Sequence, residues 1–348
     1  MSILAETPKP WDTPYCNRGQ EDARLSTATF VPTVDGRLVA LHFYGAAQRS
    51  KEAVLCVHGI GANRNNFDLF GDVESLPRQL NARGHDVYVI ELRGNGHSRT
   101  AGDPANIHDY LEYDLPAAVD HILLSHDRLH WVGHSLGGIL GYMFGGRYPG
   151  RLRSLTSVAG PLPAAVPLIG RRYLVAASQL LARQVHRRKL PNRLGAKALG
   201  LSPALARLMY NGVLFASDNI SDELLRNVAA DCLEDVSLGV LRHLAEWCKA
   251  EGPFAGEIER SLRSLRVPTL FLGATKDPLC PPAALKEAHL HMPAGFGDVR
   301  IVSRQSGHTD FGHGDILVSH AAKRHVCPQI LDFIADREPA RALDRVAS

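Results

Sequence analysis

The chain has 348 residues, 45% of them hydrophobic and 22% charged, and its formal net charge is +3. It is long enough to bury a sizeable core, and this composition is ordinary for a soluble globular protein. No window approaches 18 uninterrupted apolar residues, which argues against a membrane span and stable membrane insertion. The first residues show no basic start followed by an apolar run, so we expect no signal peptide and a cytoplasmic location.

Cysteine, histidine and charge patterns exclude several kinds of site. The six cysteines show no CxxC pair, which predicts reduced, mostly buried thiols. The pairs His289/His291 and His320/His325 lack cysteine or acidic partners at zinc spacing, so the sequence predicts no metal site. Nucleic-acid binding is not expected, because the net charge is low and no known module is present. "RGNGHS" lacks the pattern of a phosphate-binding loop.

The first half of the chain alternates short apolar runs with helical spacing. Residues 1–27 are expected to form an extended arm. "TATFVPTVDGRLVALHFYG" predicts two strands around an Asp35-Gly36 turn. The elements expected next are the strand "EAVLCVHG", the helix "NNFDLFGDVESLPRQLNARG", the strand "HDVYVIEL", the helix "DYLEYDLPAAVDHILLSH", the strand "LHWVGH", the helix "LGGILGYMFGGRYPG" and the strand "LRSLTSVAG".

The alternation stops at Pro161 and resumes after Arg266 with the strand "VPTLFLGAT". A helix near 281–291, the strand "DVRIVS" and a last helix near 321–337 follow, whereas 161–266 is mainly helical with no clear strand. The pattern predicts an α/β fold, a doubly wound and mostly parallel sheet. Its core would comprise 28–160 and 267–348, and residues 161–266 would form an inserted helical lid.

The stretch "GHSLG", from Gly133 to Gly137, fits the pattern G-x-S-x-G. It follows a predicted strand and opens a helix, which is the context that a nucleophilic serine requires. The small neighbours allow a tight turn that holds Ser135 in a strained conformation. The N–H group of Leu136 would then face negative charge on an attacked carbonyl. The alternative is a glycine-rich turn in which the serine has no role.

"HGIG", residues 58–61, follows the strand "AVLCV". Its glycines allow backbone amides to face a site at the end of the strand, and the N–H of Ile60 is the natural second donor for an oxyanion. The alternative is a plain glycine turn.

A serine nucleophile needs a base, and the base needs an orienting acid. For a serine on such a turn the chain order is serine, acid, histidine. Asp277 follows the strand "TLFLGA" and lies at the same sheet edge as Ser135. The alternative for Asp277 is a turn or capping role. His308 and His313 both follow the next strand, and their spacing does not separate them.

These motifs resemble the α/β-hydrolases of the lidded serine esterase and lipase type, over roughly residues 28–337. The carrying segments are "DGRLVALHFYG", "LCVHGIGANRNNF", "VYVIELRGNGHS", "VGHSLGG", "LFLGATKDPLCPP" and "FGHGDILVSHAAKRHVCPQILDFI". The last is similar to the ending of acid lipases, in which the histidine two residues before an aspartate is catalytic.

The resemblance implies that Ser135, Asp277 and His313 form the catalytic triad and that Ile60 and Leu136 form the oxyanion hole. His308 is then expected to shape the loop, and Asp315 to cap the following helix. The strand before "RGNGHS" ends in Glu91-Leu92, where many members of the family have an aspartate before the arginine.

The charges of the predicted lid are uneven. Thirteen Lys or Arg and no acidic residue lie between Asp127 and Asp218. Within this stretch, Tyr173–Leu190 has the spacing of a basic amphipathic helix, with Arg183, Arg187 and Arg188 beside its apolar positions. Either this helix packs on the core with a solvated basic face, or the charge receives an anionic group of the substrate.

The sequence as a whole predicts a carboxylic-ester hydrolase that works through an acyl-enzyme and needs no cofactor. Two alternatives stay open. One is a thioesterase or acyltransferase with the same triad, and the other is a non-catalytic protein of this fold that binds a small ligand.

Overall fold

The computed structural model describes residues 26–47, 52–69, 74–167, 189–249 and 251–337. Most of the expected N-terminal arm and most of the predicted basic helix Tyr173–Leu190 therefore lie outside the described residues. Within the described part, no helix combines the length and the apolar character needed to cross a membrane.

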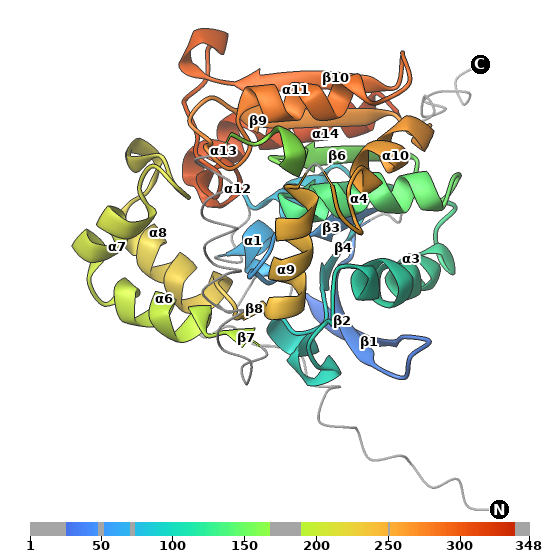
Figure 1. Cartoon of the computed structure of the whole chain (residues 1–348), viewed down its shortest axis with the longest axis horizontal. Coiled ribbons are helices and arrows are strands. Elements are labelled where there is room, and N and C mark those ends of the chain that lie inside the picture. Colours follow the sequence, from blue (N-terminus) through green and yellow to red (C-terminus); the bar gives the residue numbers. More distant parts are fainter. Residues whose placement is uncertain (1–25, 48–51, 70–73, 168–188, 250, 338–348) are drawn as a thin grey trace, which may run out of the picture.

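An eight-stranded sheet forms the centre of the structure, in the order β1-β2-β4-β3-β5-β6-β9-β10 (Figure 1). The six strands from β4 to β10 in this order pair in parallel, and β1 and β2 form an antiparallel edge. The predicted doubly wound, mostly parallel sheet is confirmed. The strands are β1 (Thr27–Pro32), β2 (Leu38–Tyr44), β3 (Glu52–Val57), β4 (Asp86–Glu91), β5 (Arg128–His134), β6 (Ser154–Val158), β9 (Thr269–Ala274) and β10 (Gly297–Val302).

The central strands are apolar runs because helices cover both faces of the sheet. Every residue of β3, β4, β6 and β9 is buried. The edge hairpin of β1 and β2 turns at Gly36, whose φ of 78° suits glycine. The helices of the core are α1 (Asn65–Asp68), α2 (Leu76–Ala82), α3 (Leu115–Leu123), α4 (Leu136–Arg147), α11 (Pro282–Leu290), α12 (Asp315–Val318), α13 (His320–His325) and α14 (Cys327–Ala335), with the 3-10 helices η1 (Gly96–Ala101) and η6 (Arg304–Ser306) and the π-helix η2 (Tyr110–Asp114).

Three of the expected helices are interrupted. The stretch after β3 forms the two short helices α1 and α2. The helix predicted between β4 and β5 begins with the π-helix η2 and continues as α3. The last predicted helix, near 321–337, is divided into α13 and α14, and the short helix α12 precedes it. Ser319 has an extended backbone and its hydroxyl accepts from the N–H of Ala322, which starts a new helix. A proline in the first turn of α14 then marks another start.

The segment 161–266 lies between β6 and β9, and its expected lack of strands is wrong. β7 (Lys189–Leu190) and β8 (Val236–Ser237) pair antiparallel, but two residues each are too few for a recognisable sequence pattern. Figure 1 shows α6, α7 and α8 together beside α1 and α12. The helices of this segment are η3 (Pro163–Ala165), α6 (Asn192–Gly200), α7 (Pro203–Tyr210), η4 (Ser217–Asn219), α8 (Asp222–Asn227), η5 (Val228–Cys232), α9 (Leu238–Trp247) and α10 (Glu257–Ser264).

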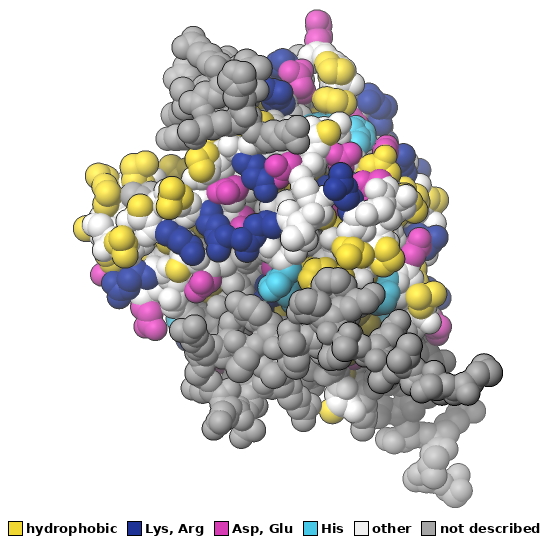
Figure 2. Space-filling view, turned by 90° about the horizontal axis from the view of Figure 1, so that it is seen from below, with side chains coloured by type: hydrophobic (Ala, Val, Ile, Leu, Met, Phe, Trp, Pro, Cys, Tyr) yellow, Lys and Arg dark blue, Asp and Glu magenta, His cyan; other side chains and the backbone are white. Residues whose placement is uncertain are grey.

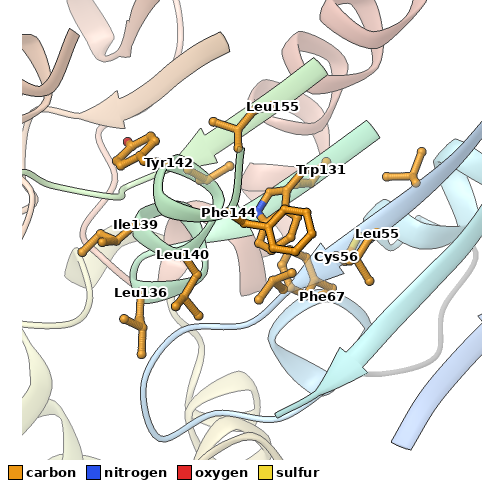
Figure 3. Close-up of a cluster of buried hydrophobic side chains, with 14 of the residues drawn as sticks. Leu55, Cys56, Phe67, Trp131, Leu136, Ile139, Leu140, Tyr142, Phe144 and Leu155 are labelled. Atoms are coloured by element: carbon orange, nitrogen blue, oxygen red, sulfur yellow. The ribbon is translucent and has the colours of Figure 1, made fainter. Parts of the chain in front are cut away.

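The core between the sheet and α4 is built around Trp131 of β5 and Phe144 of α4 (Figure 3). Their rings stack with centroids 5.5 Å apart, and the indole N–H of Trp131 donates to the carbonyl of Gly137 at 3.0 Å. A Cβ on Gly137 would lie 2.0 Å from the carbonyl oxygen of Val57. The absence of a side chain there lets the start of α4 pack directly against the end of β3.

Replacing Trp131 by Ala should lower the free energy of unfolding by about 3–5 kcal/mol, because the change leaves a cavity under α4 and removes the bond to Gly137. Urea unfolding followed by circular dichroism measures the loss. Leu124, which is 83% exposed, is the control. Its replacement by Ala should change the same quantity by no more than about 0.5 kcal/mol. Equal effects of the two substitutions would contradict this account of the core.

Candidate active site

Ser135 lies in the turn between β5 and α4, with φ of 52° and ψ of −116°. A positive φ is uncommon for a residue with a side chain and costs on the order of 1–3 kcal/mol. The turn is held by the bond from the Ser135 N–H to the carbonyl of Val158, at 2.8 Å. A Cβ on Gly133 would lie 2.1 Å from the carbonyl oxygen of Gly137, so the turn requires glycine at that position.

The three side chains predicted to form a triad lie in one hydrogen-bonded row. His313 Nε2 is 2.8 Å from Ser135 Oγ, and His313 Nδ1 is 2.8 Å from Asp277 Oδ2. Asp277 lies three residues beyond the end of β9, and its Oδ1 accepts from the N–H groups of Leu279 and Cys280, each at 2.8 Å. If Nδ1–H donates to the carboxylate, Nε2 is free to accept the serine proton.

The other candidate base, His308, is placed elsewhere. Its Nδ1 faces the Nδ1 of His325 at 3.3 Å. Of the two histidines that the spacing left open, the structure therefore brings only His313 to Ser135.

His134, the residue before Ser135, connects three parts of the site. Its Nε2 is 2.9 Å from the carbonyl oxygen of His313, and its Nδ1 is 2.9 Å from Asn66 Oδ1. Asn66 Oδ1 also accepts from the N–H of Gly59 at 3.1 Å. Burial lowers the pKa of His134 to about 3, so the ring is neutral and its single N–H donates to one of these two oxygens. The sequence analysis missed His134 and Asn66, although His134 lies within the motif "GHSLG".

Asp315 does not cap the following helix, contrary to the sequence-based expectation. The cap position is Gly314, and no side chain caps the helix. The buried carboxylate instead accepts from the N–H groups of Gly312 and Ala216, each at 3.0 Å, and from Asn219 Nδ2 at 2.7 Å. It thereby joins the His313 loop to the segment 161–266. Burial raises the pKa of Asp315 to about 6.

The two residues predicted to supply oxyanion donors border the same space. Leu136 is the first residue of α4, where N–H groups have no partner within the helix. Ile60 follows Gly59, whose own N–H is bonded to Asn66. Both residues line the cavity in which Ser135 and His313 lie.

That cavity has a volume of about 290 Å³ and a mainly apolar wall. No Asp, Glu, Lys or Arg is among the described residues that line it. The core, with Ile139 and Val318 among its apolar residues, and the segment 161–266 contribute equal shares of the wall. Residues of that segment on the wall include Val166, Leu190, Tyr210, Leu214, Phe215, Val228, Leu233, Val236 and Leu244.

The fold and the site place the chain in a known class. The family model of the alpha/beta hydrolase fold matches residues 52–312, which is well over half of the chain. The chain therefore belongs to the α/β-hydrolase family, as its motifs predict.

Curated relatives match a smaller part. Lipase 1 of Drosophila melanogaster is 32% identical over 118 residues, which are 31% of this chain and 26% of that protein. Triacylglycerol lipase 2 of Arabidopsis thaliana is 32% identical over 109 residues, 26% of this chain and 24% of that protein. The alignments thus span about a quarter of the length of these relatives.

Solved structures match the whole fold. A thermophilic esterase from Thermogutta terrifontis superposes with a TM-score of 0.63 at 18% identity and covers 90% of this chain and 99% of its own. A monoacylglycerol lipase of Paleococcus ferrophilus gives a TM-score of 0.62 at 15% identity, with 86% of this chain and 99% of its own covered. At these identities the likeness establishes the fold.

The neutral, buried ring of His134 predicts a pH dependence of stability. Between pH of about 6.5 and about 3 the unfolded chain binds a proton on this ring and the folded chain does not. Its contribution to stability is therefore lost as the pH falls through this window. The slope of the unfolding free energy against pH is proportional to the difference in bound protons between the unfolded and folded chains. Between pH 6 and 4, His134→Gln should reduce this difference by up to about one proton.

Urea unfolding at a series of pH values measures that slope. The exposed His320 provides the control, because His320→Gln also removes one histidine but from the surface. A slope for His134→Gln equal to that of the wild-type chain would contradict the neutral state of the ring.

Proposed function

We propose that this protein is a serine hydrolase that cleaves carboxylic esters through an acyl-enzyme intermediate. The observation that carries the proposal is the row Ser135–His313–Asp277, with both hydrogen bonds at 2.8 Å and with Ser135 and His313 in the wall of an apolar cavity. The relatives named as lipases support the choice of an ester as the substrate.

In this mechanism His313 Nε2 takes the proton of Ser135 while Oγ attacks the ester carbonyl. The resulting imidazolium gives that proton to the leaving alcohol, and Asp277 stabilises its charge. Water then attacks the acyl-enzyme with His313 again as the base, which releases the acid and restores Ser135. No cofactor is required. The backbone N–H groups of Ile60 and Leu136 would stabilise the oxyanion, and each such donor is worth about 10²–10³-fold in turnover.

The cavity wall favours an ester with an uncharged, apolar acyl group. An acyl chain would bury its surface against Ile139, Val228 and Leu244, whereas an anionic group would find no charged partner among the described lining residues. Because segment 161–266 supplies much of this wall, we propose that it is the lid that selects the acyl group. The thioester and acyl-transfer alternatives gain no specific support from this lining.

The basic stretch of the proposed lid is partly neutralised. Lys189 Nζ is 2.6 Å from Asp103 Oδ1, and Arg207 Nη2 is 2.8 Å from Asp222 Oδ1. Figure 2 shows basic and acidic side chains interspersed on the face seen from below. These pairs support the structural interpretation of the basic charge. Arg183, Arg187 and Arg188 lie outside the described residues.

Ester turnover tests the triad directly. With p-nitrophenyl butyrate, Ser135→Ala and His313→Ala should each reduce kcat by about 10⁴-fold or more, because either change removes the nucleophile or its base. His308→Ala is the matched control for loss of a nearby histidine and should stay within about tenfold of wild type. If His308→Ala abolishes turnover and His313→Ala does not, the assignment of the base is wrong.

The acyl preference is tested by filling the cavity. Leu214 is half-buried in the wall, and Leu214→Trp should lower kcat/KM for a decanoyl ester by roughly 10-fold or more while sparing the acetyl ester. Leu208→Trp is the control, because Leu208 belongs to the same segment but is 78% exposed. An equal loss on both esters in Leu214→Trp would speak against acyl binding in this cavity.

A further inference from the structure

Two clusters in the described chain bring His and Glu side chains together as a metal site would. In the first, the buried carboxylate of Glu91 accepts from His42 Nε2 at 3.0 Å and from His97 Nδ1 at 2.8 Å. It also accepts from the backbone N–H groups of His97 and Arg64. With four donors, this carboxylate is fully engaged, and the cluster is explained as a support for the loop after β4.

The second cluster joins the core to the end of segment 161–266. It consists of His108, just before η2, His243 in α9, and Glu257, the first residue of α10. His108 Nε2 is 3.0 Å from Glu257 Oε1, and His243 Nε2 is 3.4 Å from Glu257 Oε2. The three potential ligand atoms lie within 4.8 Å of one another. π-helices such as η2 occur frequently at functional sites.

His243 is poorly satisfied in this arrangement. Its side chain is 0% exposed and is held by stacking on Phe254, with ring centroids 3.8 Å apart. Its Nε2 has only the long contact to Glu257 Oε2, an oxygen that already accepts from Trp247 Nε1 at 3.0 Å. Its Nδ1 has no hydrogen-bond partner among the described residues. A buried imidazole with one weak contact calls for an explanation, and a bound ion is one.

The spacing of the ligand atoms suits zinc. Zn–N and Zn–O bonds of about 2.0–2.2 Å place tetrahedral ligand atoms about 3.3–3.5 Å apart. The two imidazoles lie 3.0 and 3.4 Å from the two oxygens of Glu257, which is near this spacing, and one ligand atom from each residue lies within 4.8 Å of the others. Two imidazoles and one carboxylate form a ligand set that suits zinc. Magnesium and calcium favour oxygen ligands instead. Trp247 would then hold the carboxylate from outside the coordination sphere.

The cluster is also accessible. His108 and Glu257 line a hollow of about 440 Å³, which Glu112 and Arg147 also border. An ion could enter through this hollow, and water could occupy the remaining coordination position.

We propose that His108, His243 and Glu257 bind one zinc ion, which fastens α9 and α10 to the core. The sequence analysis considered only histidines close together in the chain, and these ligands come from three distant positions. Leu244, the neighbour of His243, lines the active-site cavity, so the ion would also fix part of that wall.

The test is metal binding by the full-length protein after removal of metal with a chelator. Equilibrium dialysis against Zn²⁺ with elemental analysis should give one bound ion per chain. Thermal unfolding should shift to higher temperature with Zn²⁺ and not with Mg²⁺. His108→Ala and Glu257→Gln should each weaken binding by at least about 10-fold and abolish the thermal shift.

Two controls make the result specific. His291→Ala removes one histidine from the surface pair His291–Glu287, which are 3.7 Å apart, and should leave binding unchanged. His97→Ala alters the first cluster and should also leave it unchanged. Circular dichroism of each metal-free variant separates loss of a ligand from loss of the fold, and Glu257→Gln carries the test if His108→Ala does not fold.

The proposal is overturned if the wild-type chain binds no zinc, or if both ligand variants bind it as tightly as the wild type. Binding that is lost in His97→Ala and kept in His108→Ala would assign the ion to the other cluster. None of these readouts depends on ester turnover, so the result stands apart from the proposed catalytic function.

Discussion

The left-handed backbone of Ser135 is the constraint on which the geometry of the site depends. The chain leaves β5 and must enter α4 within one residue, which is feasible only because Gly133 and Gly137 lack side chains. The bond from Ser135 to Val158 ties this turn to the neighbouring strand β6. The strain of the turn is thus offset by the packing of α4 on the sheet, through contacts such as that of Trp131 with Gly137.

His313 and the cavity are fixed to this turn by a small number of buried polar groups. The neutral ring of His134 lies between the carbonyl of His313 and Asn66 Oδ1 and donates to one of them, and Asn66 Oδ1 accepts from the N–H of Gly59. Asp315 holds the other side of the His313 loop and fastens it to the loop of segment 161–266 at Ala216. A displacement of that segment would therefore act on His313 as well as on the cavity wall.

Much of this could be predicted from the sequence, because the signals are local. Apolar runs marked the buried strands, and the glycines around Ser135 marked the turn. Chain order brought Asp277 to the same sheet edge, but it could not separate His308 from His313. The resemblance to lipase endings selected His313, and the structure places that residue beside Ser135.

The features that the sequence did not reveal depend on contacts between distant segments. β7 and β8 are too short to show a period. Asp315 had the position of a helix cap, yet its partners Ala216 and Asn219 lie about a hundred residues away. His108, His243 and Glu257 share no local motif, and only the packing of α9 and α10 against the core brings them together. Their role could not be inferred before the fold was known.

The central claim, that Ser135 is an activated nucleophile, is tested most directly by covalent labelling. The folded wild-type chain is treated with a fluorophosphonate probe, digested and analysed by mass spectrometry, with His313→Ala treated in parallel. The account predicts that the probe is found on the peptide that contains Ser135, and that labelling is strongly slowed in His313→Ala. A folded wild-type chain that carries no label on this peptide would contradict it.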